Sequence, residues 1–493
     1  MLKETVENIR TVIDEIYDIW DPVTHKKRLT SRLQGEYIKR EYEAASRGRR
    51  MAGWRAGRKH PSLEADKNAT IEDRVRDLIR NDGYAKRGRK ILQGYTVGTG
   101  ITGSIRNGKG EKDEEMTAIF NKWAKKVGCD ARKRNSFYGL QSLVMREIVT
   151  AGESIILKKN IPLDRVTKNI PLNLLVIESA YLDLKKDDGV NTISGVEFSD
   201  QAPSRYWIRS TTVPGVKSEQ ESSPVAASDV IHVFEEERPG QVRGVSWFAP
   251  VVTPLRDLDE YRDAEITRRK VAACFAAFVT DNNMDVTPEA KESFSKLEPG
   301  AIEFLAPGQD VKFSSPPSTA EYAPYCQTEI QKIAAGLGVT YEHLSQNLRD
   351  VNFSSARIGQ IPFLKFVKEW QTQLLVPQFL DRVFEWFKEA AILVHGSAWV
   401  DATIEWTLPR VEMLDEQKET DAINAKIRSG LTSQSEAIRS LGGDPDRVFK
   451  EIDTDNTTLD GYKIILDTDP RKVTKAGIVQ TSYQSTGGNT IDE

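Results

Sequence analysis

Apolar residues recur at three- and four-residue spacing in several stretches, which predicts that helices dominate the first third of the chain. Residues 1–20 carry such a pattern, and residues 71–97 carry another with its apolar positions on one face. Two more helices are predicted near 113–127 and 136–150. Residues 21–70 are basic and interrupted by Gly and Trp, so we expect them to be extended.

The pattern changes to short apolar runs from Ser154 to Phe234, where Pro, Gly, Asp and Ser clusters separate five predicted strands. Strand-like runs return as AIEFL and VKFSS within 281–318, and VDATIEWTLP (400–409) predicts one more strand. The later helices are predicted at 320–337, at 354–395 and, as two or three short helices, over 410–451. Residues 470–493 are polar, and we expect disorder there.

The run from Ser246 to Thr280 is unusually long for one helix. Only Pro250 and Pro254 interrupt it, both near its start, so a helix of roughly 50 Å is expected at about 1.5 Å per residue. Charged residues fill its middle and leave a thin apolar stripe, which consists of Val251, Leu255, Leu258 and Tyr261. A stripe this thin predicts that the helix does not lie in a core.

Opposite charges in this run fall four residues apart, as Arg256 with Glu260 and Glu265 with Arg269. Two hypotheses fit this spacing. A solvated helix could carry weak ion pairs within itself. A helix packed against copies of itself in a ring could instead pair these charges between neighbours.

Composition limits the possible partners. The 493 residues hold 69 Lys and Arg against 73 Asp and Glu, for a net charge of -4. Tight DNA binding through phosphates is not expected, because it normally needs a basic excess. Basic residues do gather before residue 60, and we interpret this stretch as a solvated or inter-subunit arm.

The sequence also disfavours a membrane-spanning, secreted or disulfide-bonded protein. No apolar run approaches the roughly 18 residues of a membrane span, and the N-terminus has no signal-peptide pattern. Three cysteines, Cys129, Cys274 and Cys326, lie far apart, which predicts reduced thiols. We expect a cytoplasmic protein of about three domains.

Two glycine motifs overlap. Gly98, Gly100 and Gly103 fit GxGxxG, but they follow a predicted helix and no βαβ pattern surrounds them. The stretch Gly103–Lys109 fits P-loop spacing until Gly110, where a Ser or Thr should bind Mg²⁺. We interpret the segment as a glycine loop between helices.

No motif predicts catalysis. The five histidines are scattered, and neither HExxH nor a Cys/His metal spacing occurs. No GxSxG is present either. We therefore predict no catalytic residue, no metal site and no cofactor.

Four segments together resemble the portal proteins of tailed bacteriophages, specifically the lambda-like family. They are RVRDLIRNDGYAKRGRKILQGYTVGTGI (74–101), SFYGLQSLVMREIVTAGE (136–153), HVFEEERPGQVRGVSWFAPVVTPLRDLDEYRDAEITRRKVAACFAAFV (232–279) and GVTYEHLSQNLRDVNFSSAR (338–357). The similarity runs from about residue 70 to 450, and RPGQVRG and NFSSAR are its most specific parts.

The resemblance implies an α+β portal fold, with an α/β wing, long stem helices, a small α/β clip and a helical crown, assembled as a ring. Carried onto this chain, it gives a basic arm (1–70), the first part of the wing (71–245), stem helix 1 (246–280), the clip (281–318), stem helix 2 (319–338), a channel loop (339–358), the second part of the wing (359–410), the crown (411–455) and a polar tail (456–493).

The resemblance also implies site residues. Candidates for facing DNA in the channel loop are Asn347, Arg349, Asp350, Asn352 and Ser354. The family often has Asp in place of Asn347 and Tyr in place of Phe353. Candidates for ion pairs between subunits in the stem are Arg256, Glu260, Glu265 and Arg269.

The expected function is that of a homododecamer at one capsid vertex of the virion, assembled in the host bacterial cytoplasm. Double-stranded DNA passes through it during packaging and ejection. Its implied partners are the large subunit of a separate terminase motor, the major capsid protein, the scaffold and a head-tail connector. Two alternatives remain: an NTPase or nuclease of DNA packaging that uses Gly103–Lys109, and a smaller head-tail ring adaptor.

Overall fold

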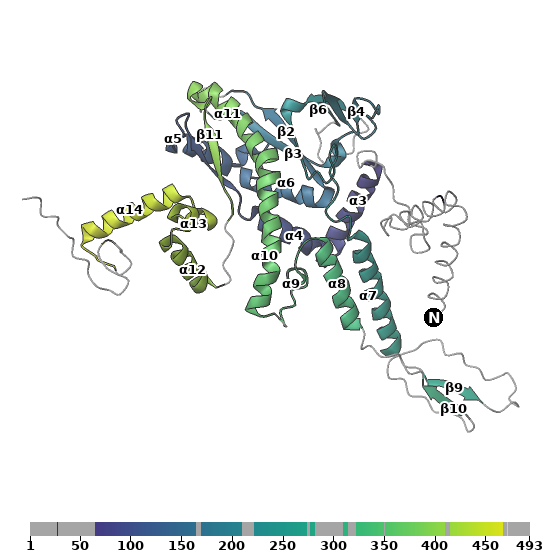
Figure 1. Ribbon diagram of the computed structural model, residues 1–493. Helices are drawn as coiled ribbons and strands as arrows, with labels where there is room; N and C mark the ends of the chain where they lie inside the picture. The colour runs from purple at the N-terminus through teal and green to yellow at the C-terminus, as the bar shows by residue number, and fades with distance from the viewer. Residues whose placement is uncertain are drawn as a thin grey trace, which may run out of the picture. The chain divides into compact units, whose positions relative to one another are not determined.

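The computed structural model describes residues 65–163, 169–209, 221–273, 277–281, 309–313, 322–349, 351–409 and 415–466, together with Lys27 and Arg471 (Figure 1). The helix predicted for 1–20, the AIEFL run and the polar residues 472–493 lie outside these residues. Every pair of named strands is antiparallel, and the helices are segregated from the sheets. The predicted α+β class is confirmed.

Two helices open the described chain where one was predicted over 71–97. They are α3 (Ala65–Asn81) and α4 (Gly83–Val97). Asp82 separates them, because its backbone is extended and its carboxylate accepts a hydrogen bond from the Ala85 N–H at 2.6 Å, which caps α4. Since α3 begins at Ala65, the extended segment predicted for 21–70 is wrong at its end.

The next two helices are confirmed. Helix α5 (Glu114–Lys125) is capped by Asp113, and α6 (Phe137–Ala151) is capped by Ser136. Gly152, in the left-handed region with φ 90°, ends α6 and turns the chain directly into a strand. Short 3-10 turns lie at Val127–Cys129, Ser179–Tyr181, Ala227–Asp229 and Ser397–Trp399.

Two small sheets form over residues 153–234, where the short apolar runs lie. The first has the order β3-β2-β8, with β2 (Glu153–Asn160) between β3 (Leu172–Ile177) and β8 (Val230–Phe234). The second has the order β4-β5-β6-β7, and its strands are β4 (Thr192–Ile193), β5 (Val196–Ser199), β6 (Ala202–Ile208) and β7 (Ser223–Ala226). The five predicted strands are confirmed as β2, β3, β5, β6 and β8. The two-residue β4 and the proline-containing β7 were not predicted.

The third sheet joins distant parts of the chain, because β1 (Thr102–Arg106) pairs with β11 (Thr403–Thr407). The strand predicted within 400–409 is thus confirmed, and β1 lies where a loop was expected. Aromatic packing makes the same connection: the Phe120 ring on α5 lies 5.0 Å from Phe387, and Phe137 lies 5.9 Å from Phe379. The segments on either side of residue 246 therefore share one core.

The helix predicted over Ser246–Thr280 is shorter than expected. Residues 247–251 form a turn, and α7 spans Val252–Ala273, which is about 33 Å at about 1.5 Å per residue. Ala277–Asp281 form strand β9, which pairs with β10 (Gln309–Phe313), so the apolar end of the run belongs to a hairpin. Helix α8 (Tyr322–Gly336) then returns along α7, as Figure 1 shows.

The remaining helices fall into two groups. Helix α9 (Tyr341–Ser345) precedes a continuous helical block made of α10 (Phe353–Glu369), the π-helical segment η8 (Trp370–Leu380) and α11 (Asp381–His395). The last group is α12 (Glu416–Arg428), α13 (Gln434–Ser440) and α14 (Pro445–Tyr462). Helix α14 continues past the crown boundary predicted at 455, because no Gly or Pro interrupts it before Gly461.

Candidate functional site

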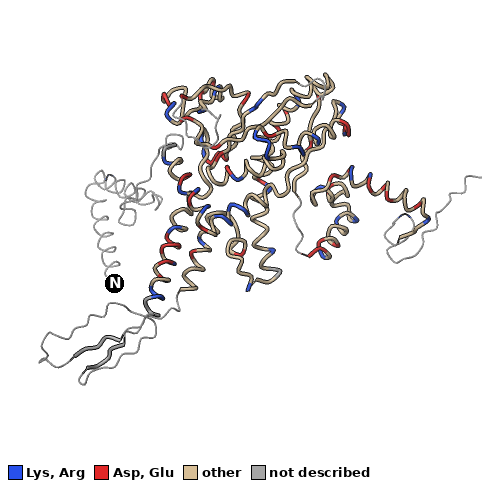
Figure 2. The backbone as a smooth tube through the Cα atoms, turned by 180° about the vertical axis from the view of Figure 1, so that it is seen from behind, with Lys and Arg blue, Asp and Glu red and all other residues tan. Residues whose placement is uncertain are grey.

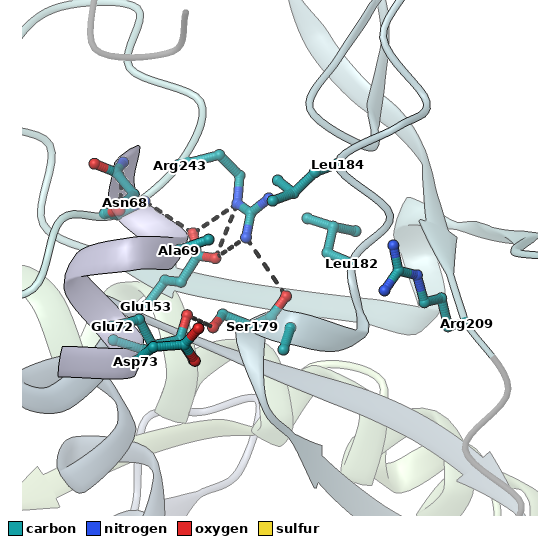
Figure 3. Close-up of a pocket in the computed structure, with 13 residues that line it drawn as sticks. Asn68, Ala69, Glu72, Asp73, Glu153, Ser179, Leu182, Leu184, Arg209 and Arg243 are labelled. Carbon is teal, nitrogen blue, oxygen red and sulfur yellow. Dashed lines mark hydrogen bonds and ion pairs between the residues drawn. The ribbon is translucent and has the colours of Figure 1, made fainter. Parts of the chain in front are cut away.

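A buried ion pair holds the segment that leads into α7. Glu153 opens β2, and Arg243 belongs to the RPGQVRG segment before α7; their side chains are 2% and 7% exposed. Arg243 Nε donates to Glu153 Oε1 at 2.8 Å and to Oε2 at 3.0 Å, and Arg243 Nη2 also donates to Oε1. Figure 3 shows the guanidinium facing this carboxylate. The pair is bidentate, which fixes its orientation as well as its distance.

His232 on β8 completes this cluster. Its Nε2 lies 3.0 Å from Glu153 Oε2, and the backbone N–H of Gly244 donates to the same oxygen at 2.8 Å. Burial would raise the pKa of Glu153, but Arg243, with His232 second, holds that pKa below its usual range. The carboxylate therefore stays charged and joins β2, β8 and the segment before α7. We call Glu153, His232 and Arg243 the anchor cluster.

Two glycines allow the backbones to meet at this point. A Cβ on Gly152 would lie 2.2 Å from the carbonyl carbon of Val245, and a Cβ on Gly244 would lie 2.2 Å from the oxygen of Gly152. Neither position can hold a larger residue without moving backbone. The end of α6 and the segment before α7 are thus fixed against each other.

A small cavity of about 170 Å³ lies beside the anchor cluster (Figure 3). Residues of α3 close one side of it, and the hydroxyl of Ser179 donates to the carboxylate of Glu72 there at 2.6 Å. Asn68 Nδ2 reaches the Gly244 oxygen at 3.4 Å. The first turns of α3 therefore also help to hold the segment before α7 in place.

The predicted apolar stripe of α7 is largely buried. Val251, Leu255 and Leu258 are at most 2% exposed and belong to the main core, so the prediction that this helix lies outside the core is wrong for its first half. Gly336 of α8 allows the close approach, because a Cβ there would lie 2.4 Å from Val251 Cγ1. The α7/α8 pair is therefore rooted at one end.

Aromatic side chains continue the contact further along. The Tyr261 ring lies 5.9 Å from that of Tyr322 and 4.5 Å from that of Tyr325, both on α8. Arg262 lies over the Tyr84 ring of α4 at 4.8 Å and donates to its hydroxyl at 3.0 Å. Cation–π contacts of this kind hold α7 to its neighbours without an apolar seam.

The four predicted stem residues pair within their own helix. Arg256 Nε donates to Glu260 Oε1 at 2.8 Å, and Glu265 Oε1 accepts from Arg268 at 2.8 Å and from Arg269 at 3.0 Å. Hydrogen bonds from Arg268, and then from Arg269, hold the pKa of Glu265 below its usual range. Figure 2 shows charged residues of both signs along α7. Pairing between copies stays a prediction.

The charges of the α7/α8 pair balance. Helix α7 holds five acidic and five basic residues, and α8 holds one of each, Glu329 and Lys332, which lie 3.4 Å apart. The described outer positions of α8 include the neutral Gln327, Thr328 and Gln331. A surface of this kind offers few fixed contacts to phosphates.

The segment predicted as the channel loop, residues 339–358, contains one short helix and the start of another. Helix α9 occupies its start, and α10 begins at Phe353, so Ser354 belongs to a helix. Asn352 caps α10, because its Oδ1 accepts from the Ser355 N–H at 2.8 Å. This capping pair was visible in the sequence as Asn followed three positions later by Ser, a weaker form of the capping box.

The other loop candidates remain in irregular backbone. Asn347 and Arg349 are exposed, and the Arg349 N–H donates to Asn347 Oδ1 at 3.3 Å. Asp350 lies outside the described residues. Asn347 and Arg349 are therefore close neighbours in the loop. The side chain of Asn352 is instead engaged in capping α10.

The glycine motifs do not form a phosphate cradle. Gly98 and Gly100, both with positive φ, end α4, and Gly103 lies within β1 opposite Trp406. Asp113 caps the helix after this strand, and Glu114 and Glu115 lie in its first turn, so their charges repel a phosphate at its N-terminus. The P-loop interpretation gains no support.

Among the described residues no group of three His, Cys, Asp or Glu side chains could hold a metal ion. No helix in the described ranges is both long and apolar enough to cross a membrane.

Comparisons with known proteins agree with one another. The family model for the phage portal protein, lambda family, matches residues 47–371. The chain is 29% identical over 423 residues to the probable portal protein of Halomonas phage phiHAP-1, covering 78% of this chain and 80% of the relative. It is 22% identical over 440 residues to portal protein B of Escherichia phage lambda, covering 77% and 81%.

A solved structure, the neck of a native GTA particle computed with C12 symmetry, matches with a TM-score of 0.46 at 15% identity. The match covers 75% of this chain and 93% of that chain. Because the family model spans well over half of the sequence, the chain belongs to the lambda family of phage portal proteins.

Proposed function

We propose that this chain is the portal subunit of a tailed phage, which assembles as a ring of twelve at one capsid vertex. Its central channel passes double-stranded DNA during packaging and ejection. The observation that carries the proposal is the match to the portal family over residues 47–371. The helix pair α7/α8, rooted in the core at one end, supplies the stem of each subunit.

The charge balance of the stem supports a conduit. A channel must let DNA slide, and each fixed phosphate contact would add affinity and salt dependence. With as many acidic as basic residues on α7 and one of each on α8, the stem contributes no net attraction. Arg349, in the loop after α9, is an exposed basic side chain. We propose that Arg349 and Asn347 face the DNA.

The partners follow from the same proposal. A separate terminase motor docks at the clip, and a head-tail connector takes its place after packaging. The capsid protein and the scaffold contact the outer parts of the ring. Our proposal is a structural role, in which the energy for translocation comes from the motor.

Deletion of residues 282–308 from the clip tests this function against a smaller ring adaptor. The full chain and the deletion variant are each mixed with purified large terminase subunit, and co-migration is measured by size-exclusion chromatography. A portal predicts that both chains form rings and that the deletion alone abolishes terminase binding. Equal terminase binding by both chains, or none by the full chain, contradicts the proposal.

A further inference from the structure

The last three helices of the described chain have almost no core. We call α12, α13 and α14 the C-terminal helical unit. Among its described residues only Ala437 and Pro445 are buried, and α12 has no buried residue. A unit of this size needs far more buried apolar surface to hold its fold alone. Something must cover it.

Hydrogen bonds and ion pairs join this unit to the rest of the described chain. Asp444 accepts from Lys112 Nζ at 2.6 Å and from the Ser104 hydroxyl at 3.3 Å. Lys450 lies 2.8 Å from Glu114, with both side chains more than two-thirds exposed. The exposed Lys450–Glu114 pair contributes little in water. The Lys112–Asp444 pair is partly buried, at 18% and 25% exposure, but it adds no apolar core to the unit.

Two helices of the unit each carry an uncovered apolar stripe. On α14, Phe449 is 37% exposed and Ile452 is 45% exposed, and half-buried Leu459 lies on the same face two turns later. On α12, Ile423 and Ile427 are half-buried, and Leu431, just after the helix, continues their four-residue spacing at 79% exposure. Apolar surface gathered in this way marks an interface.

Charges beside the two stripes are complementary. Lys426 and Arg428 lie in the last turn of α12, and Asp453 and Asp455 lie in the middle of α14. Within the described part of the chain, none of these four side chains is paired with an opposite charge. Both helices carry charges of both signs, but the unpaired charges beside the α12 stripe are basic and those beside the α14 stripe are acidic, so they can pair between two copies.

We propose that the C-terminal helical unit is completed by a neighbouring copy of this chain. The α14 stripe of one copy packs on the α12 stripe of the next, and Asp453 and Asp455 meet Lys426 and Arg428. Two different stripes, one for each neighbour, are what a closed head-to-tail ring requires. The inference rests on the proposed ring and adds that this unit becomes ordered only when the ring closes.

Hydrogen exchange of the full chain in its assembled form tests this inference. Amide exchange is followed by mass spectrometry for wild type, for Ile452→Asp and for the matched control Thr457→Asp, which adds the same charge away from the stripe. Peptides from residues 416–462 should exchange at least about tenfold faster in Ile452→Asp, while peptides from α6 stay protected. Thr457→Asp should match wild type.

Charge exchange gives an independent readout. Lys426→Glu and Asp455→Lys should each speed exchange in the same peptides, and the double variant should restore part of the protection. If Ile452→Asp alone prevents assembly, the stripe is still at the interface. Unchanged exchange in Ile452→Asp, or no rescue by the double variant, overturns the inference.

Further outcomes distinguish a neighbouring copy from the chain's own tail as the cover of the stripes, and this inference from the proposed function. A chain that ends at Arg471 should keep its protection; loss of protection would show that the chain's own tail covers the stripes. A wild-type ring whose residues 416–462 are unprotected defeats this inference and leaves the proposed function intact. A wild-type chain that never forms a ring defeats the proposed function itself.

Discussion

Removal of Arg243 is the sharpest perturbation of the anchor cluster. Arg243→Met keeps most of the apolar length of the side chain and deletes the charge that faces Glu153. Glu153 is then left at 2% exposure with His232 as its remaining side-chain partner. The Arg243 bond to the Ser194 oxygen, 3.1 Å long, is lost as well.

The expected cost is large, because a buried charge loses its partner. Breaking one side of such a pair costs about 3–5 kcal/mol. A unit of 150–250 residues shifts its melting temperature by about 2–4 °C per kcal/mol, so the transition of the surrounding region should fall by roughly 6–20 °C.

Differential scanning calorimetry at neutral pH measures this shift. The matched control is Arg205→Met, because Arg205 lies 2.7 Å from Glu197 but its side chain is 54% exposed. That change should cost at most about 1 kcal/mol. The double variant Glu153→Gln/Arg243→Met should recover part of the loss. If Arg243→Met lowers the transition no more than Arg205→Met does, the anchor cluster does not support the fold as argued.

The same cluster predicts a pH dependence. The pKa of Glu153 is lower in the folded chain than its ordinary value of 4.5, so its stabilisation is present in full above that value. It is lost as the pH falls below 4.5 toward the folded pKa. Glu153→Gln should therefore lower the melting temperature at neutral pH and flatten its decline in acid. A parallel decline in both chains would contradict the assignment.

Gly244→Ala should cost at least about 1–3 kcal/mol by calorimetry, because its Cβ would strike the Gly152 oxygen, whereas Gly83→Ala has open space and should be nearly neutral. Glu265→Lys should reduce the fraction of ring that survives rising salt in analytical ultracentrifugation, and adding Arg269→Glu should restore part of it; independent effects would show that the two residues do not act as a pair. Lys109→Ala should leave Mg-ATP binding as absent as in wild type by calorimetric titration, and ATP binding that this change abolishes would revive the nucleotide site.

Local patterns in the sequence were enough for most elements. The periods of α5, α6 and α8 and the apolar runs of β2 and β8 lie within single segments, and the structure confirms these elements. The wrongly predicted end of the long helix also has a local cause. Ala277–Asp281 is an apolar run that fits a helix or a strand equally well, and its pairing with β10 decides the outcome.

The anchor cluster was beyond sequence reasoning. Glu153 and Arg243 are 90 positions apart, and nothing near either residue marks it as half of a pair. The sheet brings His232 and Glu153 together, and the turn after α6 brings Gly152 against Gly244. Of the two hypotheses for the α7 charges, pairing within the helix follows from the four-residue spacing, and Arg256 and Glu260 do pair in this way. Pairing between copies stays a prediction.

Assembly of the purified full-length chain into a ring is measured by its mass and shape. Native mass spectrometry with negative-stain images should show a particle near twelve times the 55.4 kDa chain mass, with a central hole. A stable 55.4 kDa monomer, even when scaffold protein is present, would show that this chain is not a portal subunit.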